Sequence, residues 1–460
     1  MFARSGGRNN AAAPLCRIRN DASCGRAQWR RRGALAAIGA SQTAHNLPLV
    51  PNASIANRAE QVTMAQATDD PVVIVAAART PIGSMMGAFS TLQAHQLGSV
   101  AVRAALQRSG IAGEKVDEVL LGNCLLAGQG QAPARQAALG AGLPMSAGAV
   151  TLSKMCGSGM RAMMFAHDML LAGSAQLVVA GGMESMTNAP YLVPKARQGY
   201  RYGHGTLFDH MALDGLEDAY ERGKAMGVFA EECVAKFGFS RAEQDRFAIT
   251  SVERAVGASQ DGSFQWEIAP VAVEGKSDQT LIAQDEQPFR ARPDKVAQLK
   301  PAFKKDGTIT AASSSPISDG AAALLLARES GASRLGARPL ARIRAHALHA
   351  QEPSWFTTAP IGAIAKVLAK ANWRAEDVDL WEINEAFAAV TMAAMREYRL
   401  AHERVNVHGG ACALGHPIGA SGARIVVTLI GALRRRGLRR GVAALCIGGG
   451  EATALALELL

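Results

Sequence analysis

The sequence has few aromatic residues and, over most of its length, no strong charge of one sign. Phe, Trp and Tyr make up 5% of its 460 residues. The formal net charge is +10, but residues 1–63 hold nine Arg against Asp21 and Glu60, which leaves a net of only +3 on the other 397 residues. A nucleic-acid surface needs clustered positive charge and aromatic platforms for bases, so the composition argues against that class of partner. The small positive excess still suits a small anionic substrate.

Cysteine is sparse and scattered. The seven cysteines are Cys16, Cys24, Cys124, Cys156, Cys233, Cys412 and Cys446. Their number is odd and no two are spaced as CxxC, which disfavours both a disulfide framework and a Cys₄ zinc site. A reducing compartment fits best. Since 48% of the residues are apolar, the chain has enough hydrophobic content for two or three packed domains.

Long hydrophobic runs are also missing. No stretch of 18 uncharged apolar residues occurs, so no membrane span is expected. Residues 1–66 form a basic N-terminal extension that is rich in Arg and Ala and nearly free of acids, as mitochondrial transit peptides are. An untranslated or disordered leader is the alternative, since Met64 stands just before the first strand-like run. We predict a cytoplasmic protein, or a mitochondrial one if residues 1–63 are a transit peptide.

From residue 72 onward, short β-rich runs alternate with Ala-, Leu- and Met-rich helical stretches. This alternation is typical of βαβ units around a largely parallel sheet. The pattern occurs twice, because "ALQRSGIAGEKVDEVLLGN" is answered by "VLAKANWRAEDVDLWEIN". An offset of 262 pairs Leu106 with Leu368 and Val116 with Val378. The sequence therefore predicts two copies of one α/β unit.

Residues 190–310 differ from both copies, since they are richer in charge, Tyr, Phe and Pro. They include a predicted helix with Ser240 as its N-cap and Glu243 three residues on. We interpret the segment as an inserted lobe that overhangs the strand ends, where α/β folds bind ligands. The predicted domains are the extension 1–66, a first half 67–189 completed by 311–335, the inserted loop domain 190–310, and a second half 336–460.

Cys156 lies in "TLSKMCGSGMRA", between a strand-like run and the start of a predicted helix that Gly173 ends. Amides at a helix N-terminus favour a thiolate, so we expect this cysteine to be more acidic than a free one. Gly157 and Gly159 would let a substrate approach the backbone closely. An inert buried cysteine is the alternative when this stretch is considered alone.

The segment "NVHGGACALGHPIGASGAR" spaces His408, Cys412 and His416 four residues apart, which on a continuous helix would form a metal-binding face. Five glycines and Pro417 disfavour such a helix, so we predict no metal site. We expect a tight loop that presents His416, followed by a helix that starts after Pro417.

Two further stretches end predicted strands. "LCIGGGEATALALE" ends one at Cys446 and Ile447, turns on three glycines and returns as another strand. "WEINEAFA" ends a strand on Asn384 and is expected to open a helix at Glu385, with Asn384 as a helix cap in the plainer interpretation. All four stretches lie at the carboxyl end of a predicted strand, which predicts one site with two thiols, an imidazole and an amide.

Four blocks in this order, "SKMCGSGM", "NEAFA", "GHPIGASGAR" and "CIGGG", resemble the thiolases, CoA-dependent enzymes that make or break 3-ketoacyl-CoA. The resemblance covers about residues 70–460. It implies an α/β fold in which two βαβαβαββ halves pack as five layers, α-β-α-β-α, with a loop domain inserted in the first half. It also implies a homo-oligomer, either a dimer or a tetramer.

The resemblance assigns catalytic roles. Cys156 is the acylated nucleophile, His416 is the base that activates it, and Cys446 exchanges a proton with the substrate carbon. His416 and a water held by Asn384 form one oxyanion hole. The backbone amides of Cys156 and Gly448 form the other.

Ser315 and Met226 match residues of the coenzyme A and acyl pocket. Three positions depart from the usual pattern: Ala225 replaces His, Phe356 replaces Met and His408 replaces Asn. The first two border the pocket, so they bear on the preferred acyl chain.

The resemblance implies an acetyl-CoA C-acetyltransferase that condenses two acetyl-CoA through an acetyl-cysteine. Coenzyme A is then a co-substrate, with no tightly bound cofactor and no nucleic-acid or membrane partner. The alternatives are a 3-ketoacyl-CoA thiolase for longer chains, a condensing enzyme acting on acyl carrier protein, which would normally lack Cys446, and a catalytically silent CoA-binding protein.

Overall fold

The computed structural model describes residues 70–275 and 278–460. The predicted extension, residues 1–66, lies outside the described residues, and the transit-peptide hypothesis falls there too. Within the described part of the chain, no helix has the combination of length and apolar character needed to cross a membrane.

The first half of the chain builds a sheet with the strand order β4-β3-β5-β10-β1. Its strands are β1 (Val72–Arg79), β3 (Glu118–Gly122), β4 (Gly148–Leu152), β5 (Leu177–Ser185) and β10 (Ser318–Arg328), and the short β2 (Gly83–Ser84) pairs with β10. β3 is parallel to β4 and β5, whereas β10 is antiparallel to β5 and β1. The central strands β5 and β10 are buried on both faces, which explains their continuous runs of small and apolar residues.

The second half repeats this arrangement in the order β12-β13-β14-β11. Its strands are β11 (Ala341–Ala350), β12 (Leu380–Ile383), β13 (Arg440–Ile447) and β14 (Glu451–Leu459). The counterpart of β4 is reduced to a single parallel bridge between Trp381 and Val405. β1 and β11 pair over two residues and join the two halves edge to edge.

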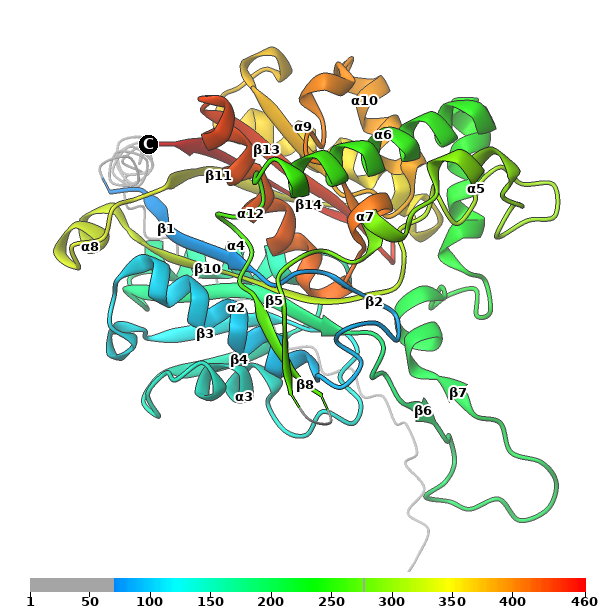
Figure 1. Ribbon diagram of the computed structural model, residues 1–460, viewed down its shortest axis with the longest axis horizontal. Helices are drawn as coiled ribbons and strands as arrows, with labels where there is room; N and C mark the ends of the chain where they lie inside the picture. Colours follow the sequence, from blue (N-terminus) through cyan, green and yellow to red (C-terminus); the bar gives the residue numbers. More distant parts are fainter. Residues whose placement is uncertain (1–69, 276–277) are drawn as a thin grey trace, which may run out of the picture. The chain divides into compact units, whose positions relative to one another are not determined.

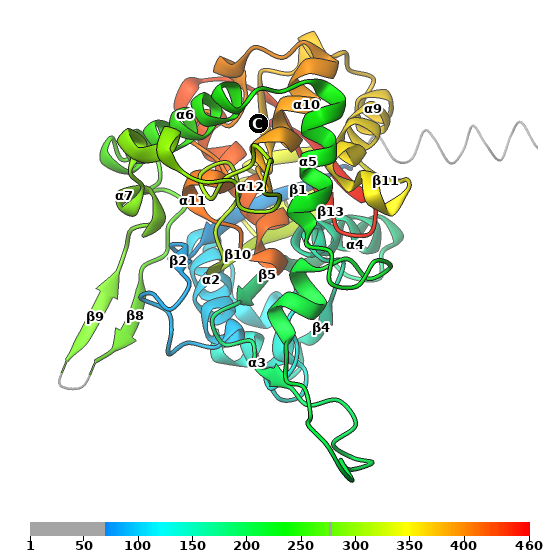
Figure 2. The same cartoon turned by 90° about the vertical axis from the view of Figure 1, so that its right-hand side faces the viewer.

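Helices separate and cover the two sheets, as Figures 1 and 2 show. α4 (Ser158–Ala172) and α12 (Ile418–Arg436) lie between the sheets and share one core with both. α2 (Ala94–Ser109) and α3 (Pro133–Gly140) cover the outer face of the first sheet. α9 (Ala359–Ala371) and α10 (Ala388–Tyr398) cover the second. The layers run α-β-α-β-α, so the predicted fold class is confirmed.

The two central helices touch backbone to backbone. A Cβ on Gly159 of α4 would stand 2.8 Å from the backbone nitrogen of Ala423, and one on Gly422 of α12 would stand 2.5 Å from the backbone nitrogen of Met160. Contacts that short are not tolerated, so only glycine lets α4 and α12 cross this closely. The crossing brings the turn before α4 next to the turn before α12.

The internal repeat is present in the structure. Adding 262 to the start of β3, residue 118, gives 380, the start of β12. Leu106 lies in α2 and Leu368 in α9. Val116 and Val378 each follow a short 3₁₀ turn, η1 (Gly113–Lys115) and η5 (Ala375–Asp377). The two halves are copies of one unit, as the sequence predicts.

Residues 190–310 contribute elements that lie outside the two repeated halves. These are β6 (Tyr191–Leu192), β7 (Phe208–Asp209), the π-helix η2 (Ala212–Leu216), α5 (Met226–Phe237), α6 (Arg241–Gln260), β8 (Val271–Glu274), β9 (Gln279–Ile282), α7 (Gln287–Arg290) and η3 (Pro293–Gln298). α5 packs on α10, and α6 packs on α10 and α11 (Ala411–Leu414), above the second sheet (Figure 2). The predicted capping box of Ser240 and Glu243 starts α6. The remaining elements are α8 (Glu329–Arg334), η4 (Pro353–Thr358) and η6 (His402–Arg404).

Candidate active site

Cys156 lies on the turn between β4 and α4. Met155, just before it, has a φ of +46°, a left-handed conformation that is costly for a residue with a side chain. The Ser158 hydroxyl holds this turn, because it accepts from the backbone N–H of Lys154 at 2.8 Å and donates to the Met155 carbonyl at 2.6 Å. The turn and the helix that Gly173 ends lie where the sequence predicts them.

The Cys156 sulfur lies among amides and apolar side chains. Burial raises the pKa of Cys156 to about 11, although hydrogen bonds from the backbone N–H groups of Gly448 and of Cys156 itself act to lower it. The expected acidic cysteine is therefore a wrong prediction, because loss of hydration outweighs the helix-terminal amides. The two amides assigned to an oxyanion hole do converge on this sulfur.

Cys446 is fully buried near the end of β13. Its pKa is raised well above that of a free thiol, first by burial and then by the neighbouring charge of Cys156. The sulfurs of residues 156 and 446 thus interact, although they come from different halves. The turn after β13 uses Gly449 and Gly450 at φ of +91° and +85°, and it aims the Gly448 amide at Cys156.

His416 lies on the predicted tight loop, and α12 begins at Ile418, directly after Pro417. The imidazole is buried, and its Nδ1 lies 2.5 Å from the Ser421 hydroxyl. Its Nε2 has no hydrogen-bond partner among residues 70–275 and 278–460, so that nitrogen is left for another molecule. No direct hydrogen bond joins His416 to Cys156 within the same residues.

The Ser421 hydroxyl controls the tautomer of His416. Its oxygen also lies 2.9 Å from the Pro417 carbonyl. When the hydroxyl donates to that carbonyl, Nδ1–H of His416 donates to the serine and Nε2 carries a lone pair. When the hydroxyl turns to Nδ1, the ring proton is on Nε2. One imidazole can therefore serve as a base in one state and as a hydrogen-bond donor in the other.

Burial and the nearby Arg424 lower the pKa of His416 to about 3. The imidazole is therefore neutral near pH 7. Since the pKa of Cys156 is about 11, the resting pair is a neutral thiol and a neutral imidazole.

Asn384 follows β12 and is buried. Its side-chain oxygen accepts from Arg424 at 3.5 Å, while its Nδ2 has no partner in the described residues. Arg424 also lies 3.5 Å from the carboxylate of Glu382, whose pKa is raised to about 8 by burial despite that cation. Arg424 acts on both Asn384 and His416, so the two unpartnered nitrogens belong to one region.

The helix after Asn384 begins later than predicted. α10 starts at Ala388 and not at Glu385, so Asn384 is not its cap. The reason is non-local, since the buried Glu385 carboxylate holds an extended loop. It accepts from the Asn406 side chain at 2.7 Å, the Ser251 hydroxyl at 2.8 Å and the Cys412 backbone at 3.0 Å.

Ser315 and Met226 lie on opposite sides of this loop and turn. The backbone N–H and the hydroxyl of Ser315 both donate to the Ala386 carbonyl, at 3.0 and 3.1 Å. Met226 is the first residue of α5, and its sulfur lies 3.6 Å from where a Cβ on Gly448 would stand. It packs in the same apolar cluster as Cys446 and Phe356.

The sequence interpretation missed three supporting groups: Ser421, Arg424 and Glu184. The Glu184 carboxylate on β5 accepts from the backbone amides of Cys124, Leu125 and Gly419, so it ties the loop after β3 to the start of α12. Ser421 and Arg424 lie inside "GHPIGASGAR". The sequence does not show that they contact His416 and Asn384, so their roles could not be inferred from it. Glu184 is the only acidic residue in the largely apolar strand β5, and this is the one sequence feature that could have indicated its role.

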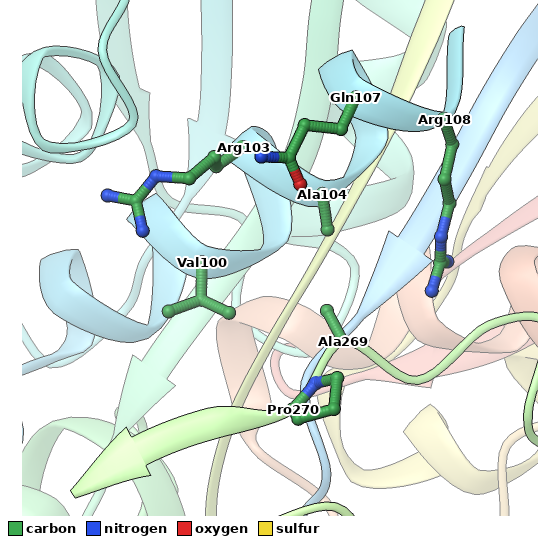
Figure 3. Close-up of a pocket in the computed structure, with 7 residues that line it drawn as sticks. All are labelled: Val100, Arg103, Ala104, Gln107, Arg108, Ala269 and Pro270. Carbon is green, nitrogen blue, oxygen red and sulfur yellow. The ribbon is translucent and has the colours of Figure 1, made fainter. Parts of the chain in front are cut away.

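His408, Cys412 and His416 do not face one another. The Cys412 sulfur points to the Glu385 carbonyl at 3.7 Å, and the His408 ring packs edge-on against Phe264. A cavity of about 450 Å³ lies elsewhere, between α2 and Pro270 (Figure 3), and none of the predicted site residues lines it.

Comparison with known proteins covers nearly all of the described chain. The model for the thiolase N-terminal domain matches residues 72–330, and that for the thiolase C-terminal domain matches residues 337–459. An acetyl-CoA acetyltransferase of Chromobacterium violaceum is 48% identical over 84% of this chain and 99% of its own. Acetyl-CoA acetyltransferase 2 of Arabidopsis thaliana is 48% identical over 85% of this chain and 97% of its own.

Solved structures agree with these matches. The Bacillus anthracis acetyl-CoA acetyltransferase superposes with a TM-score of 0.83 at 41% identity, over 85% of this chain and 99% of its own. The Acat5 thiolase of Ascaris suum, solved in complex with coenzyme A, gives 0.80 at 42% identity, over 85% of this chain and 100% of its own. Since the two family models match residues 72–330 and 337–459, the chain belongs to the thiolase family and is an acyltransferase.

Proposed function

We propose that the protein is an acetyl-CoA C-acetyltransferase, which reversibly condenses two acetyl-CoA into acetoacetyl-CoA and CoA. The observation that carries the proposal is the environment of Cys156, whose sulfur receives two backbone N–H groups and lies beside Cys446. The names of the relatives support the acetyl substrate, and they do not favour the longer-chain alternative.

In the first half-reaction, the Cys156 sulfur attacks the thioester carbon of acetyl-CoA. Its proton passes to Nε2 of His416, the nitrogen without a protein partner. The bond to the CoA sulfur breaks, and the leaving thiolate takes the proton of Cys446. The raised pKa keeps Cys446 protonated until the CoA thiolate forms beside it, and it makes the resulting Cys446 thiolate a strong base for the second half-reaction.

In the second half-reaction, the Cys446 thiolate removes a proton from the methyl carbon of a second acetyl-CoA. The carbanion attacks the acetyl carbon on Cys156, a carbon–carbon bond forms and the carbon–sulfur bond breaks. Cys156 then recovers its proton from His416. Both cysteines end as thiols, so the cycle closes without another reactant.

Charge that develops on oxygen needs donors already in place. The amides of Cys156 and Gly448 point at the sulfur, so an acyl oxygen on that sulfur would lie within their reach. The unpartnered Nδ2 of Asn384 and Nε2 of His416 suit a water and the second thioester oxygen. Nε2 of His416 accepts the Cys156 proton as a base in the first half-reaction, and it then carries the N–H that can donate in the second.

For coenzyme A we propose a path along Ser315 and Met226. Ser315 lies on the loop next to Ala386, where its oxygen still has lone pairs for a pantetheine amide. Met226 and Phe356 form an apolar wall beside Cys446. Large side chains at that wall favour a short acyl group.

We also propose a homo-oligomer. β4 is an edge strand with Val150 exposed on it, and the apolar side chains of Phe165 and Leu171 on α4 are also exposed. Unpaired edge groups beside apolar surface favour contact with another chain. Mass measurement by light scattering tests this proposal, and a monomer at micromolar concentration would contradict it.

The catalytic test uses two variants. Cys156→Ala should lose both condensation and thiolysis by at least ~10³-fold, because no acyl-enzyme forms. Cys446→Ala should still become acetylated, visible as a gain in protein mass on mixing with acetyl-CoA, but should not condense. Normal turnover in the Cys156 variant would refute the mechanism.

The substrate is tested separately with a series of 3-ketoacyl-CoA chains. We expect thiolysis rates to fall steeply beyond acetoacetyl-CoA. A flat profile out to long chains would instead establish the longer-chain thiolase.

A further inference from the structure

Three potential metal ligands from α4 and β11 meet at a place that includes none of the predicted site residues. They are His167 and Asp168 of α4 and His346 of β11. The sequence interpretation predicts no metal site and does not consider these residues, and 178 residues separate Asp168 from His346. Contacts of His346 with His167 and Asp168 join the central helix α4 to β11 of the second sheet.

The three ligand atoms form a nearly equilateral triangle. Nδ1 of His167 lies 3.0 Å from Oδ1 of Asp168 and 3.1 Å from Nε2 of His346, and Nε2 of His346 lies 2.9 Å from the same oxygen. Ligand atoms around tetrahedral Zn²⁺, with bonds of about 2.0–2.1 Å, are roughly 3.3 Å apart. The triangle needs to open by only a few tenths of an ångström to become one face of such a site.

Hydrogen bonding alone does not satisfy this triangle. When Asp168 is ionised, its carboxylate faces Nδ1 of His167 and Nε2 of His346. Each of these two nitrogens is either protonated, as N–H, or carries a lone pair. If both carry one, two N–H groups face each other at 3.1 Å. If either lacks one, its lone pair faces the carboxylate oxygen. A cation bound to all three lone pairs removes this conflict.

The surroundings suit an ion with one open position. The side chains of His167 and His346 are only 15% and 13% exposed, whereas that of Asp168 is 54% exposed. The imidazoles are thus sheltered, and the carboxylate faces the solvent from which an ion would enter.

We propose that His167, Asp168 and His346 form a binding site for a divalent transition-metal ion of the Zn²⁺ type, with water in the fourth position. Two imidazoles and one carboxylate are the ligand set that such borderline ions prefer over Mg²⁺ or Ca²⁺. The ion fastens α4, which carries Cys156 at its start, to β11 of the other half. Its role is structural, since its ligands include no residue of the active site.

Lys370 is the neighbouring cation that opposes binding. Its ammonium group donates to the backbone carbonyl of His346 at 3.1 Å, which places its positive charge next to the strand that carries this ligand. The contact is to the strand backbone, so it leaves the three ligand atoms free. We expect Lys370→Met to tighten metal binding by a few-fold, because it removes the opposing charge and leaves every ligand in place.

The test uses the purified full-length protein, stripped with EDTA and alkylated so that the active-site thiols cannot bind metal. Zn²⁺ is titrated in competition with a chromophoric chelator. We expect one ion per chain in the native sequence. Asp168→Asn, which keeps the volume of an exposed side chain, should weaken affinity at least ~10-fold, and His346→Ala should abolish binding.

His349→Ala is the matched control, because His349 lies on the same strand but contacts Gly362 of α9 on the other side. It should bind Zn²⁺ as the native chain does. Zn²⁺ should also raise the unfolding temperature of the native chain and of His349→Ala, but not of His346→Ala. Equal affinity in the native chain, Asp168→Asn and His346→Ala would overturn the proposal, as would loss of all binding on alkylation. Both readouts are independent of acetyl transfer.

Discussion

Cys156 and His416 are both neutral at rest, because a charged form of either side chain would be buried without the water that stabilises it in solution. Burial raises the pKa of the thiol to about 11 and lowers that of the imidazole to about 3. At the scale of the residue, activation must therefore come with the substrate. A thioester carbonyl placed on the amides of Cys156 and Gly448 offers the negative charge a place to go as the proton leaves the sulfur.

This assignment predicts how Cys156 reacts with iodoacetamide. Alkylation needs the thiolate, so its rate should rise about tenfold for each pH unit between pH 7 and pH 9, without a plateau. The measurement is mass spectrometry of the peptide that contains residue 156, with Cys156→Ala as the blank. A plateau that begins below pH 8 would show an acidic thiol and contradict the effect of burial.

Ser421 is a positioning residue for His416, and its removal should show in the pH profile. We expect Ser421→Ala to lower kcat by roughly 10–100-fold, because Nδ1 of His416 loses the hydroxyl that partners it in both tautomers. Ser421→Thr keeps the hydroxyl and should recover most of the rate. The midpoint of the kcat–pH profile should move in the alanine variant and not in the threonine variant. Equal loss in both variants with an unchanged profile would indicate packing alone.

At the scale of the element, the two central helices determine where the chemistry lies. α4 presents Cys156 at its start, and α12 begins two residues after His416. Their glycine contact sets how closely these two helix starts approach. The stretch 418–433 of α12 is buried throughout, so the helix has no exposed side on which to relax.

Gly422→Ala tests that contact. A Cβ there would lie 2.5 Å from the backbone of Met160, so we expect a loss of about 1–3 kcal/mol in the free energy of unfolding, with lower activity. Gly257→Ala in α6 is the control, because a Cβ there meets nothing within 4 Å and should be neutral or slightly stabilising. Urea unfolding measures both. Equal stability of the two variants would show that the helices can separate without cost.

The start of a helix could be predicted from the sequence where residues of the helix itself determine it. It could not be predicted where contacts with distant residues determine it. Ser240 and Glu243 start α6, and Pro417 sets the start of α12, because those signals lie within the element itself. The start of α10 was predicted three residues early, because Glu385 bonds to residues 251, 406 and 412. The wrong acidity of Cys156 has the same origin, since a helix terminus is visible in sequence and burial is not.

At the scale of the whole molecule, the part of the chain that matches the relatives does not include the N-terminal residues. The two curated relatives are matched over 97–99% of their own length, yet they cover only 84–85% of this chain. The family models begin at residue 72. The predicted extension 1–66 is therefore additional to the part that the relatives share.

Deleting residues 1–66 should leave kcat/KM within about twofold, because none of the predicted catalytic groups and none of their described partners lies there. The measurement is thiolysis of acetoacetyl-CoA by the full and the shortened chain. A loss beyond tenfold with an intact fold by circular dichroism would assign the extension a part in catalysis.

N-terminal sequencing of the protein from its host tests localisation. A mature start near Met64 without organelle import would remove the transit-peptide hypothesis.

The repeat also bears on how the active site is shared between the two halves. Cys156 comes from one copy, whereas Asn384, His416 and Cys446 come from the other, and the position that matches Cys156 in the second copy is Ile418. In a symmetric pair of identical units, each of these residues would occur twice, once in each copy. Here the second nucleophile position holds an apolar residue, so only one copy supplies the acylated sulfur. The two halves thus share one fold but contribute different residues to the single active site.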